Sequence, residues 1–514
     1  METEITTGTK KYDGFLEGLK KIVSADRQSF SVDGKVVNMN PCWLRDHIHE
    51  MKGYKYWEKE IKTGLEHFLQ RQTPRGFFYE MIVPIDNEHT KMVSPEFVQF
   101  DEKNKLAYVR LEIEADIEYL MVEGVYNVWQ ATGDMEWMKE NLEKVERGIE
   151  YCLTDPVRFC KGHMLVKRAF TIDTWDFTYG VPTNNRRIEP TTPMAIMHGD
   201  NSGIYSSCLM LARMYGELAN FDRVRYWQEK AEDFRHRTNS ICWNGKFYTH
   251  QVPIQNPPST GVNEKDILSL SNTYDINRGL PDHKMAVSII NEYIKRRKET
   301  QGKYFSEWFS IHPAYPDFCG YKPGEYINGG VAGFVAGELA KASFEHGFEN
   351  YAVDILDRLV NLWKRDGTIH FLYTPDGKEY GGGPRGWGAS AIISAIIEGL
   401  AGVRDESCLF ERIKLSPRWA SIKEEQANVS VVYGASETFL NYEYAHRGSI
   451  ISMSVEGNKT REISFHILLP EGKKAKKVVC AGKTPQFTNL KIEKSSYVDF
   501  VHKGSGKVEI YVEM

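Results

Sequence analysis

The stretch Pro323-Gly-Glu-Tyr-Ile-Asn-Gly-Gly-Val-Ala-Gly-Phe-Val-Ala-Gly-Glu-Leu339 joins a polar loop directly to an apolar helix. Its second half has the spacing of one helical face, i, i+3, i+4 and i+8, at Val331, Phe334, Val335 and Leu339. Its first half carries a carboxylate, an aromatic ring and an amide among Gly and Pro residues. Because binding groups usually lie on loops held by rigid elements, we predict that this loop forms one wall of a pocket.

The same helical spacing recurs in pairs between residues 50 and 402. Short turns join the members of a pair, while longer loops rich in Gly, Pro and aromatic residues separate the pairs. Some members are amphipathic and others are apolar nearly all round, which is typical of a buried helix. Repeated pairs predict a solenoid or a closed ring of helical hairpins, and the long polar loops favour a ring with a pocket. The expected helices span 54–72, 112–131, 135–152, 202–218, 222–238, 284–298, 329–346, 349–365 and 388–400.

The character of the chain changes on both sides of this helical region. Residues 1–40 begin with a short helical piece and continue as a hairpin, with Asp33 and Gly34 at its turn. After residue 405, runs with strand character start near 428, 438, 449, 461, 478 and 507. We therefore expect an N-terminal lead with short strands at 1–40, a helical ring at 41–405 and an all-β, sandwich-like domain at 406–514.

Composition limits the classes of partner. The 514 residues carry 65 basic and 70 acidic side chains, interspersed, so no basic stripe for nucleic acid or anionic membrane is present. No stretch reaches the ~18 apolar residues of a membrane span, and the first residues lack the apolar core of a secretory signal. The eight cysteines are scattered, as reduced thiols are. We expect a cytoplasmic protein, unless a leader preceded this numbering; the sequence does not indicate its oligomeric state.

Four loops near helix ends concentrate polar and aromatic residues; they lie at 43–49, 171–179 (continuing to 198–201), around Glu325, and at 376–387. In the first, Arg45 could orient the carboxylate of Asp46 toward sugar hydroxyls, or the two could form an internal salt bridge. His47 and His49 alternate as metal ligands on a strand would, but no third or fourth ligand is evident. We therefore expect no metal site.

The second loop carries the candidate general acid. Asp173 and Asp176 flank Trp175, and burial beside an indole raises the pKa of a carboxyl, as a general acid requires. The alternative is an Asp that bonds a backbone turn. Glu325 could act as a base, bind a hydroxyl, or bond only the amides of its own loop. The Gly-rich stretch 381–386 lacks the Lys-Ser/Thr ending of a phosphate-binding loop, so we expect it to aim Arg385 and the residues after it.

Together these pieces resemble the inverting glycoside hydrolases built on an (α/α)6 toroid, a group that includes neutral invertases, processing α-glucosidases, debranching glucosidase domains and α-rhamnosidases. The similarity covers roughly residues 40–405. It lies in Trp-Leu-Arg-Asp at 43–46, Glu-Ala-Asp-Ile-Glu-Tyr-Leu at 114–120, Asp-Thr-Trp-Asp at 173–176, Tyr-Ile-Asn-Gly-Gly at 326–330 and Gly-Trp-Gly-Ala-Ser at 386–390. It implies a mainly α fold, an (α/α)6 toroid followed by a β-sandwich, and an exo-acting glycosidase that uses no cofactor.

The resemblance also implies roles for single residues. Asp176 or Asp173 would protonate the leaving oxygen, while Glu379 or Glu325 would activate a water. The base Glu of these families often stands 17 positions before the closing Trp, where this chain has His370. The residues expected to hold the sugar are Arg45, Asp46, His47, Trp175, Tyr326, Asn328, His370, Arg385 and Trp387.

Other functions on the same toroid stay open at this point. A sugar epimerase or isomerase, or a polysaccharide lyase, would use His or Tyr as the base, with His47, His198, His312 and His370 as candidates. A phosphorylase would need only the acid and a phosphate-binding Arg. A carbohydrate-binding or scaffold protein with an inactive pocket is the non-enzymatic alternative.

Overall fold

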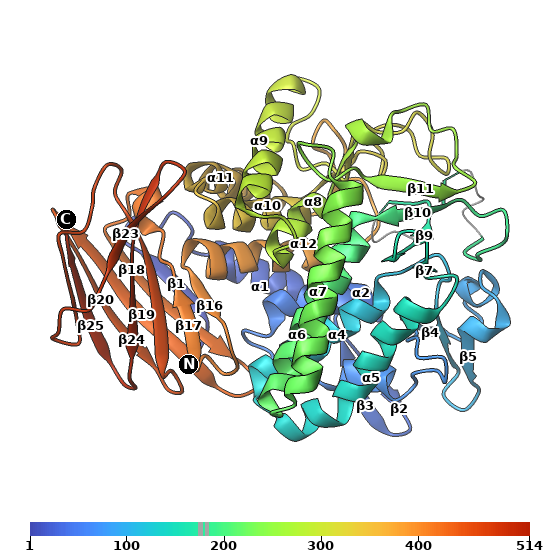
Figure 1. The fold of residues 1–514 in the computed structure, drawn as a ribbon, viewed down its shortest axis with the longest axis horizontal. Coiled ribbons are helices and arrows are strands. Elements are labelled where there is room, and N and C mark those ends of the chain that lie inside the picture. Colours follow the sequence, from blue (N-terminus) through green and yellow to red (C-terminus); the bar gives the residue numbers. More distant parts are fainter. Residues whose placement is uncertain (173–177, 180–184) are drawn as a thin grey trace.

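The computed structural model describes residues 1–172, 178–179 and 185–514 (Figure 1). These residues contain twelve α-helices and twenty-five strands, many of the strands very short. The helices build a ring, and most of the long strands build a sandwich beside it, coloured orange to red at the left of Figure 1. The expectation of a mainly α chain is therefore only partly right, because short strands also lie in the loops of the ring.

Six helices form the inner wall of the ring. Each packs against the next in chain order, and the last packs against the first, which closes the circle. They are surrounded on all sides, so that in the last of them every residue after Arg385 is buried. The inner helices are α2 (Leu44–Tyr54), α4 (Ile117–Thr132), α6 (His198–Glu217), α8 (Ser271–Arg278), α10 (Gly333–Glu345) and α12 (Arg385–Ser394), the last continued by a π-helical turn, Ala395–Leu400.

Six further helices alternate with these and form the outer layer. They are amphipathic: α11 buries Ala352, Ile355, Leu356 and Leu359, which share one helical face, and exposes its other face. The outer helices are α1 (Phe15–Ala25), α3 (Thr63–Leu69), α5 (Met135–Thr154), α7 (Phe221–Cys242), α9 (His283–Glu299) and α11 (Glu349–Asp366). The predicted ring of helical hairpins is thus present.

Some elements differ from the prediction. The helix expected at 54–72 is divided, because α2 ends at Tyr54 and α3 begins only at Thr63. The first candidate loop, 43–49, is mostly the beginning of α2. Helix α8 was missed because its eight residues, Ser-Asn-Thr-Tyr-Asp-Ile-Asn-Arg, lack the apolar stripe of a typical buried helix. Among the described residues, no helix is both long and apolar enough to cross a bilayer.

The sandwich consists of two sheets. Their strand orders are β1-β18-β19-β20-β25-β22 and β16-β17-β21-β24-β23, and neighbours are antiparallel except β17 and β21. The N-terminal strand β1 (Glu4–Thr7) pairs with β18, so residues 1–40 are divided among the sandwich, the ring (α1) and a hairpin, and do not form a separate lead. The other strands are β16 (Val403–Asp405), β17 (Arg412–Leu415), β18 (Gln426–Tyr433), β19 (Thr438–Arg447), β20 (Ile450–Gly457), β21 (Glu462–Leu469), β22 (Lys477–Cys480), β23 (Thr488–Ile492), β24 (Ser495–Lys503) and β25 (Val508–Glu513).

The hairpin predicted near the N-terminus is confirmed. Strands β2 (Gln28–Val32) and β3 (Lys35–Met39) pair across Asp33 and Gly34. Both turn residues have positive φ, 51° and 77°, which a two-residue turn of type I′ requires and which Asp-Gly supplies readily.

The two ends of the ring are built differently. Connections from an inner to the next outer helix are short between α4 and α5, α6 and α7, α8 and α9, and α10 and α11. Connections into the inner helices are long, and those into α4, α6, α8, α10 and α12 carry small sheets. Besides the hairpin β2–β3 before α2, these strands are β4 (Met81–Pro84), β5 (Val98–Asp101), β6 (Leu106–Val109), β7 (Phe159–Cys160), β8 (Leu165–Val166), β9 (Arg168–Ala169), β10 (Met194–Met197), β11 (Gln251–Gln255), β12 (Leu268–Ser269), β13 (Ile311–His312), β14 (Val331–Ala332) and β15 (Leu372–Tyr373). The end where inner helices begin therefore carries most of the loops on which a site can be built.

A buried ion network ties together the starts of three inner helices. Arg45 of α2 makes a two-pronged contact with Asp116, the residue before α4, at 2.6 and 3.0 Å. Its guanidinium also lies 2.8 Å from Glu114. Arg168 pairs with Glu114 and, at 3.3 Å, with Asp200 in the first turn of α6. Removing one member of such a network leaves an unpaired charge inside the protein.

We expect Arg168→Met to lower the free energy of unfolding by about 3–5 kcal/mol, the range for a broken buried pair. Urea denaturation followed by circular dichroism measures this. The matched control is Arg225→Met, whose partner Asp222 lies on the exposed outer face of α7 and whose side chain is 70% exposed. The control should change stability by less than about 1 kcal/mol. Equal effects of the two substitutions would show that the network does not hold the ring together.

Candidate active site

The residues predicted from three of the four loops meet at the end of the ring where the inner helices begin. Gly386 of α12 donates its backbone N–H to the carboxylate of Asp26, at 2.5 Å, next to Glu50 of α2. The Tyr326 hydroxyl donates to the carbonyl of Gly382 at 3.2 Å, which joins the third loop to the fourth. Asp173, Trp175 and Asp176, from the second loop, lie outside the described residues, so their roles stay predictions.

Arg45 forms an internal salt bridge, but not with the residue next to it. Its partners are Asp116 and Glu114, and the side chain is 6% exposed. The guanidinium holds the pKa of Asp116 well below its usual range, so this carboxylate stays ionised despite its burial. The expectation that Arg45 orients Asp46 or binds sugar is corrected, because its donors face the network.

Asp46 is the carboxyl that the network leaves without an ion-pair partner among the described residues. It lies in the first turn of α2 and is 8% exposed. Burial raises the pKa of Asp46 to about 7, although Arg45 lies beside it and acts in the opposite direction. The structure therefore provides a group at this end that changes its protonation state near neutral pH.

Two further carboxyls accompany Asp46. Glu50 follows one turn later on the same face of α2, and burial together with the charge of Asp26 raises its pKa well above the usual range. Burial also raises the pKa of Asp26, while the N–H of Gly386 acts against that shift. Neither Glu50 nor Asp26 was predicted. The available signal was the i, i+4 spacing of Asp46 and Glu50, which is informative only if residues 44–54 are helical.

The two histidines of the first loop do not form a metal pair. Because they lie on a helix and not on a strand, residues two apart point in different directions. His47 accepts the N–H of Asn40 through Nδ1 at 3.0 Å and contacts the Tyr54 hydroxyl at 3.0 Å, and burial lowers its pKa to about 3. His47 is therefore a packing residue, which corrects its assignment to the sugar site.

Trp387 is part of the wall of the ring. Its indole stacks on His49 at a centroid distance of 4.2 Å, and its N–H donates to the Tyr274 hydroxyl at 2.9 Å. Only 2% of Trp387 is exposed. Burial also holds the pKa of His49 well below its usual value, so the imidazole is neutral. Neither ring nitrogen of His49 has a hydrogen-bond partner among the described residues.

Glu379, His370 and Arg385 come together, as members of one predicted site would. The Glu379 carboxylate lies 3.2 Å from the Arg385 guanidinium and 3.1 Å from Nδ1 of His370. Half of the Glu379 side chain is exposed, and so is nearly half of that of Arg385. His370 thus contacts one of the two glutamates expected to act as the base.

In the loop around Glu325, two of the polar side chains expected in the site bond groups of the protein itself. The Glu325 carboxylate accepts the N–H of Lys322 at 3.0 Å, within its own loop. The buried Asn328 amide accepts the N–H of Tyr315 and donates to the carbonyls of Tyr315 and Tyr321, at 2.9, 2.9 and 3.0 Å. The expectation that Asn328 holds sugar is corrected, because its amide group is fully used in shaping the loop.

The histidine pair that an epimerase or lyase would need is not available at the surface of this site. His198 lies 2.5 Å from Asp275 through Nδ1 and 2.9 Å from the Ser269 hydroxyl through Nε2, and it is completely buried. His312 stacks on Phe309, and burial lowers its pKa to about 4. Among the described histidines, His198 is thus enclosed and His312 is largely buried, whereas His370 contacts the Glu379 carboxylate.

No protein-family profile matches this sequence, and no curated protein is similar to it. Solved structures are similar in fold. An α-L-rhamnosidase from Dictyoglumus thermophilum matches all of this chain and 51% of its own, with a TM-score of 0.60 and 10% identity. An α-L-rhamnosidase from Streptomyces avermitilis, complexed with L-rhamnose, matches all of this chain and 42% of its own, with a TM-score of 0.59 and 12% identity.

A shorter protein is also similar. The GH63 mannosylglycerate hydrolase from Thermus thermophilus matches 74% of this chain and 99% of its own, with a TM-score of 0.51 and 13% identity. This chain spans about half of the length of the Dictyoglumus rhamnosidase and less of the Streptomyces one. At such identities the likeness establishes the fold alone: this chain has the helical toroid, with accompanying β-structure, found in these glycoside hydrolases.

Proposed function

We propose that this chain is an inverting glycoside hydrolase that removes a sugar from a non-reducing end. The observation that carries the proposal is the presence of two carboxyls in contrasting surroundings at one end of the ring. Asp46 is desolvated, with a pKa near 7, whereas Glu379 is half exposed and lies between His370 and Arg385. The exposed Glu379 suits the activation of a water, and the enclosed Asp46 suits the binding of a substrate hydroxyl. The fold shared with rhamnosidases and a mannosylglycerate hydrolase agrees with this.

In this proposal Glu379 is the general base. Its carboxylate reaches solvent, so it can activate a water, and the Arg385 guanidinium beside it fixes its orientation. Glu325 is less suited because its carboxylate is used by the N–H of Lys322. Asp176, or Asp173, remains the proposed general acid, on the loop that leads toward α6. Inversion requires that the acid and base carboxyls lie about 6.5–9.5 Å apart.

Asp46 is proposed to accept a hydroxyl of the bound sugar. It is enclosed beside the ion network, and a charged hydrogen bond in such surroundings contributes about 1.5–3 kcal/mol. Tyr326 and Arg385 would line the more open side of the same pocket, and Trp387 would support the wall from behind. The chemistry needs no metal or organic cofactor.

Aryl glycosides whose leaving groups differ in basicity test the proposed general acid and the proposed general base separately. We expect Asp176→Asn and Glu379→Gln each to lower kcat by about 10²–10⁴-fold on a poor leaving group, because each loses a proton-transfer group. A strongly activated leaving group should restore much of the rate of Asp176→Asn and little of that of Glu379→Gln. The matched control, Glu325→Gln, should keep most of its activity. If Glu325→Gln is as impaired as Glu379→Gln, the base is wrongly assigned.

Asp46 predicts a particular pH profile. Because burial raises its pKa to about 7, the accepting, ionised form is gained as pH rises through that value. We therefore expect kcat/KM of the free enzyme to increase with pH up to about 7. Asp46→Asn should lower kcat/KM by roughly 10–150-fold, the equivalent of one charged hydrogen bond, and should remove that limb of the profile. If kcat/KM of Asp46→Asn rises with pH as that of the wild type does, another group causes the rise, and the proposed role of Asp46 is contradicted.

A further inference from the structure

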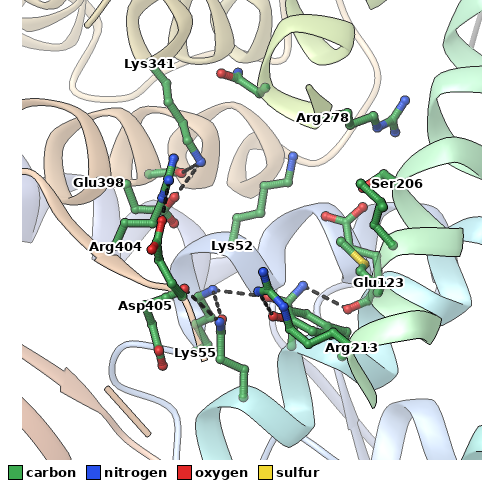
Figure 2. Close-up of a pocket in the computed structure, with 18 of the residues that line it drawn as sticks. Lys52, Lys55, Glu123, Ser206, Arg213, Arg278, Lys341, Glu398, Arg404 and Asp405 are labelled. Carbon is green, nitrogen blue, oxygen red and sulfur yellow. Dashed lines mark hydrogen bonds and ion pairs between the residues drawn. The ribbon is translucent and has the colours of Figure 1, made fainter. Parts of the chain in front are cut away.

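A cavity of about 360 Å³ lies at the other end of the ring (Figure 2). It is lined by later turns of α2, α4, α6, α8 and α10, by the π-helical turn after α12, and by β16 and β18 of the sandwich. The candidate active site is formed where the inner helices begin, so the two sites lie at opposite ends of these helices. Tyr274 separates them, because it lines the cavity and accepts the indole N–H of Trp387.

The wall of the cavity carries six basic and five acidic side chains. Three of the basic groups have carboxylate partners close by: Lys52 with Glu338 at 2.8 Å, Lys341 with Glu398 at 2.5 Å, and Arg404 with Glu406 at 2.5 Å. Two of these pairs join inner helices, and the third lies at the start of the sandwich. The other three basic side chains lack such a partner.

Lys55, Arg213 and Arg278 have no carboxylate within 4 Å among the residues that the structure describes. Lys55 is 5% exposed and donates only to the amide oxygens of Asn127 and Gln130, at 3.1 and 3.4 Å. Burial lowers the pKa of Lys55, while the more distant carboxylates of Glu398, Asp405 and Glu123 act in the opposite direction. None of these carboxylates forms an ion pair with Lys55 within 4 Å.

The two arginines are held by neutral groups as well. Arg213 donates to the Tyr126 hydroxyl at 2.6 Å, and Arg278 donates to the carbonyl of Gly199 and the hydroxyl of Ser202, at 2.9 and 3.0 Å. Figure 2 shows that Lys55, Arg213 and Arg278 come from three different sides of the cavity. Each therefore has a neutral partner that fixes its position and, among the described residues, no carboxylate in direct ion-pair contact.

The remaining lining adds groups that suit a hydroxylated ligand. No hydrogen-bond donor contacts the carboxylate of Glu123 among the described residues, and this side chain faces the cavity in Figure 2. The phenol rings of Tyr126 and Tyr274 also line it. Carboxylates accept hydroxyl hydrogens, while guanidinium and ammonium groups bind phosphate or carboxylate. The volume is within the range of small-molecule sites.

We propose that this cavity binds a small hydroxylated anion, a phosphorylated or carboxylated sugar, with Lys55, Arg213 and Arg278 neutralising its charge. The site is independent of the proposed hydrolysis, since none of these residues belongs to the candidate active site. Its occupation would place an anionic group against three basic side chains that have no direct ion-pair partner among the described residues.

Isothermal titration calorimetry of the full chain tests this, with glucose 6-phosphate, glucuronate, inorganic phosphate and glucose as probes. We expect at least one of the two charged sugars to bind more tightly than inorganic phosphate, and glucose to give no binding. Binding of glucuronate alone, or of the sugar phosphate alone, identifies which anionic group the site takes. No binding by either charged sugar, or equally tight binding of glucose or of inorganic phosphate, would overturn the proposal.

Variants locate the binding. Lys55→Met and Arg213→Gln should each weaken it at least tenfold, whereas Asp46→Asn, at the other end of the ring, should leave it unchanged. The matched control Arg225→Gln, on the exposed face of α7, should also have no effect. Lys55→Met removes an uncompensated buried charge, so its thermal unfolding temperature should not fall, which separates lost binding from lost structure. If affinity is unchanged in both cavity variants, the anion binds elsewhere.

Discussion

The structure depends on a set of buried charges at the place where three inner helices begin. Arg45, Arg110 and Arg168 are enclosed with five carboxyl groups, those of Glu80, Glu114, Asp116, Glu118 and Asp200. Burial raises the pKa of Glu80 to about 8, so this group is protonated at neutral pH and the excess of negative charge is reduced. Such a network tolerates little change, because loss of one partner leaves another unpaired in a medium of low dielectric constant.

This constraint also explains the candidate site. Arg45 is turned toward Asp116 across 71 residues of chain, and the adjacent Asp46 is left at the edge of the network without a partner of its own. The result is a carboxyl that is held in place by its helix and whose pKa lies near neutrality. Long connections into the inner helices carry Glu379 and Tyr326 at the same end of the ring, while the sandwich covers part of the opposite end. The asymmetry of the ring thus separates a carboxylate-rich end from an end with unpaired cations.

Much of the architecture follows from local patterns in the sequence. Helices α5, α7 and α11 and the six strand runs after residue 405 have strong periodicity, and the structure contains them close to the predicted positions. What escaped prediction depends on distant partners. Helices α2 and α8 are buried although polar, because their side chains are paired with groups far away in the sequence, and β1 completes a sheet with β18, more than 400 residues later. An apolar stripe cannot reveal either case.

The candidate site likewise has contacts that the sequence indicates and contacts that it does not. Glu379, His370 and Arg385 are near one another in the sequence, and their association follows from one loop. Asn328 and His47 have residue types suited to sugar binding, yet their hydrogen bonds are used for packing, which only the three-dimensional contacts reveal. The pKa of Asp46 arises from burial by elements that are not adjacent in sequence, and so could not be read from its neighbours.

We propose hydrolysis with inversion at the end of the ring where the inner helices begin. Proton NMR of the first sugar released from an aryl glycoside tests it most directly, because the anomeric signal is recorded before mutarotation. Inversion requires that the initial product have the anomeric configuration opposite to that of the substrate. An initial product of the same configuration, or no turnover across a panel of α- and β-aryl glycosides, would contradict it.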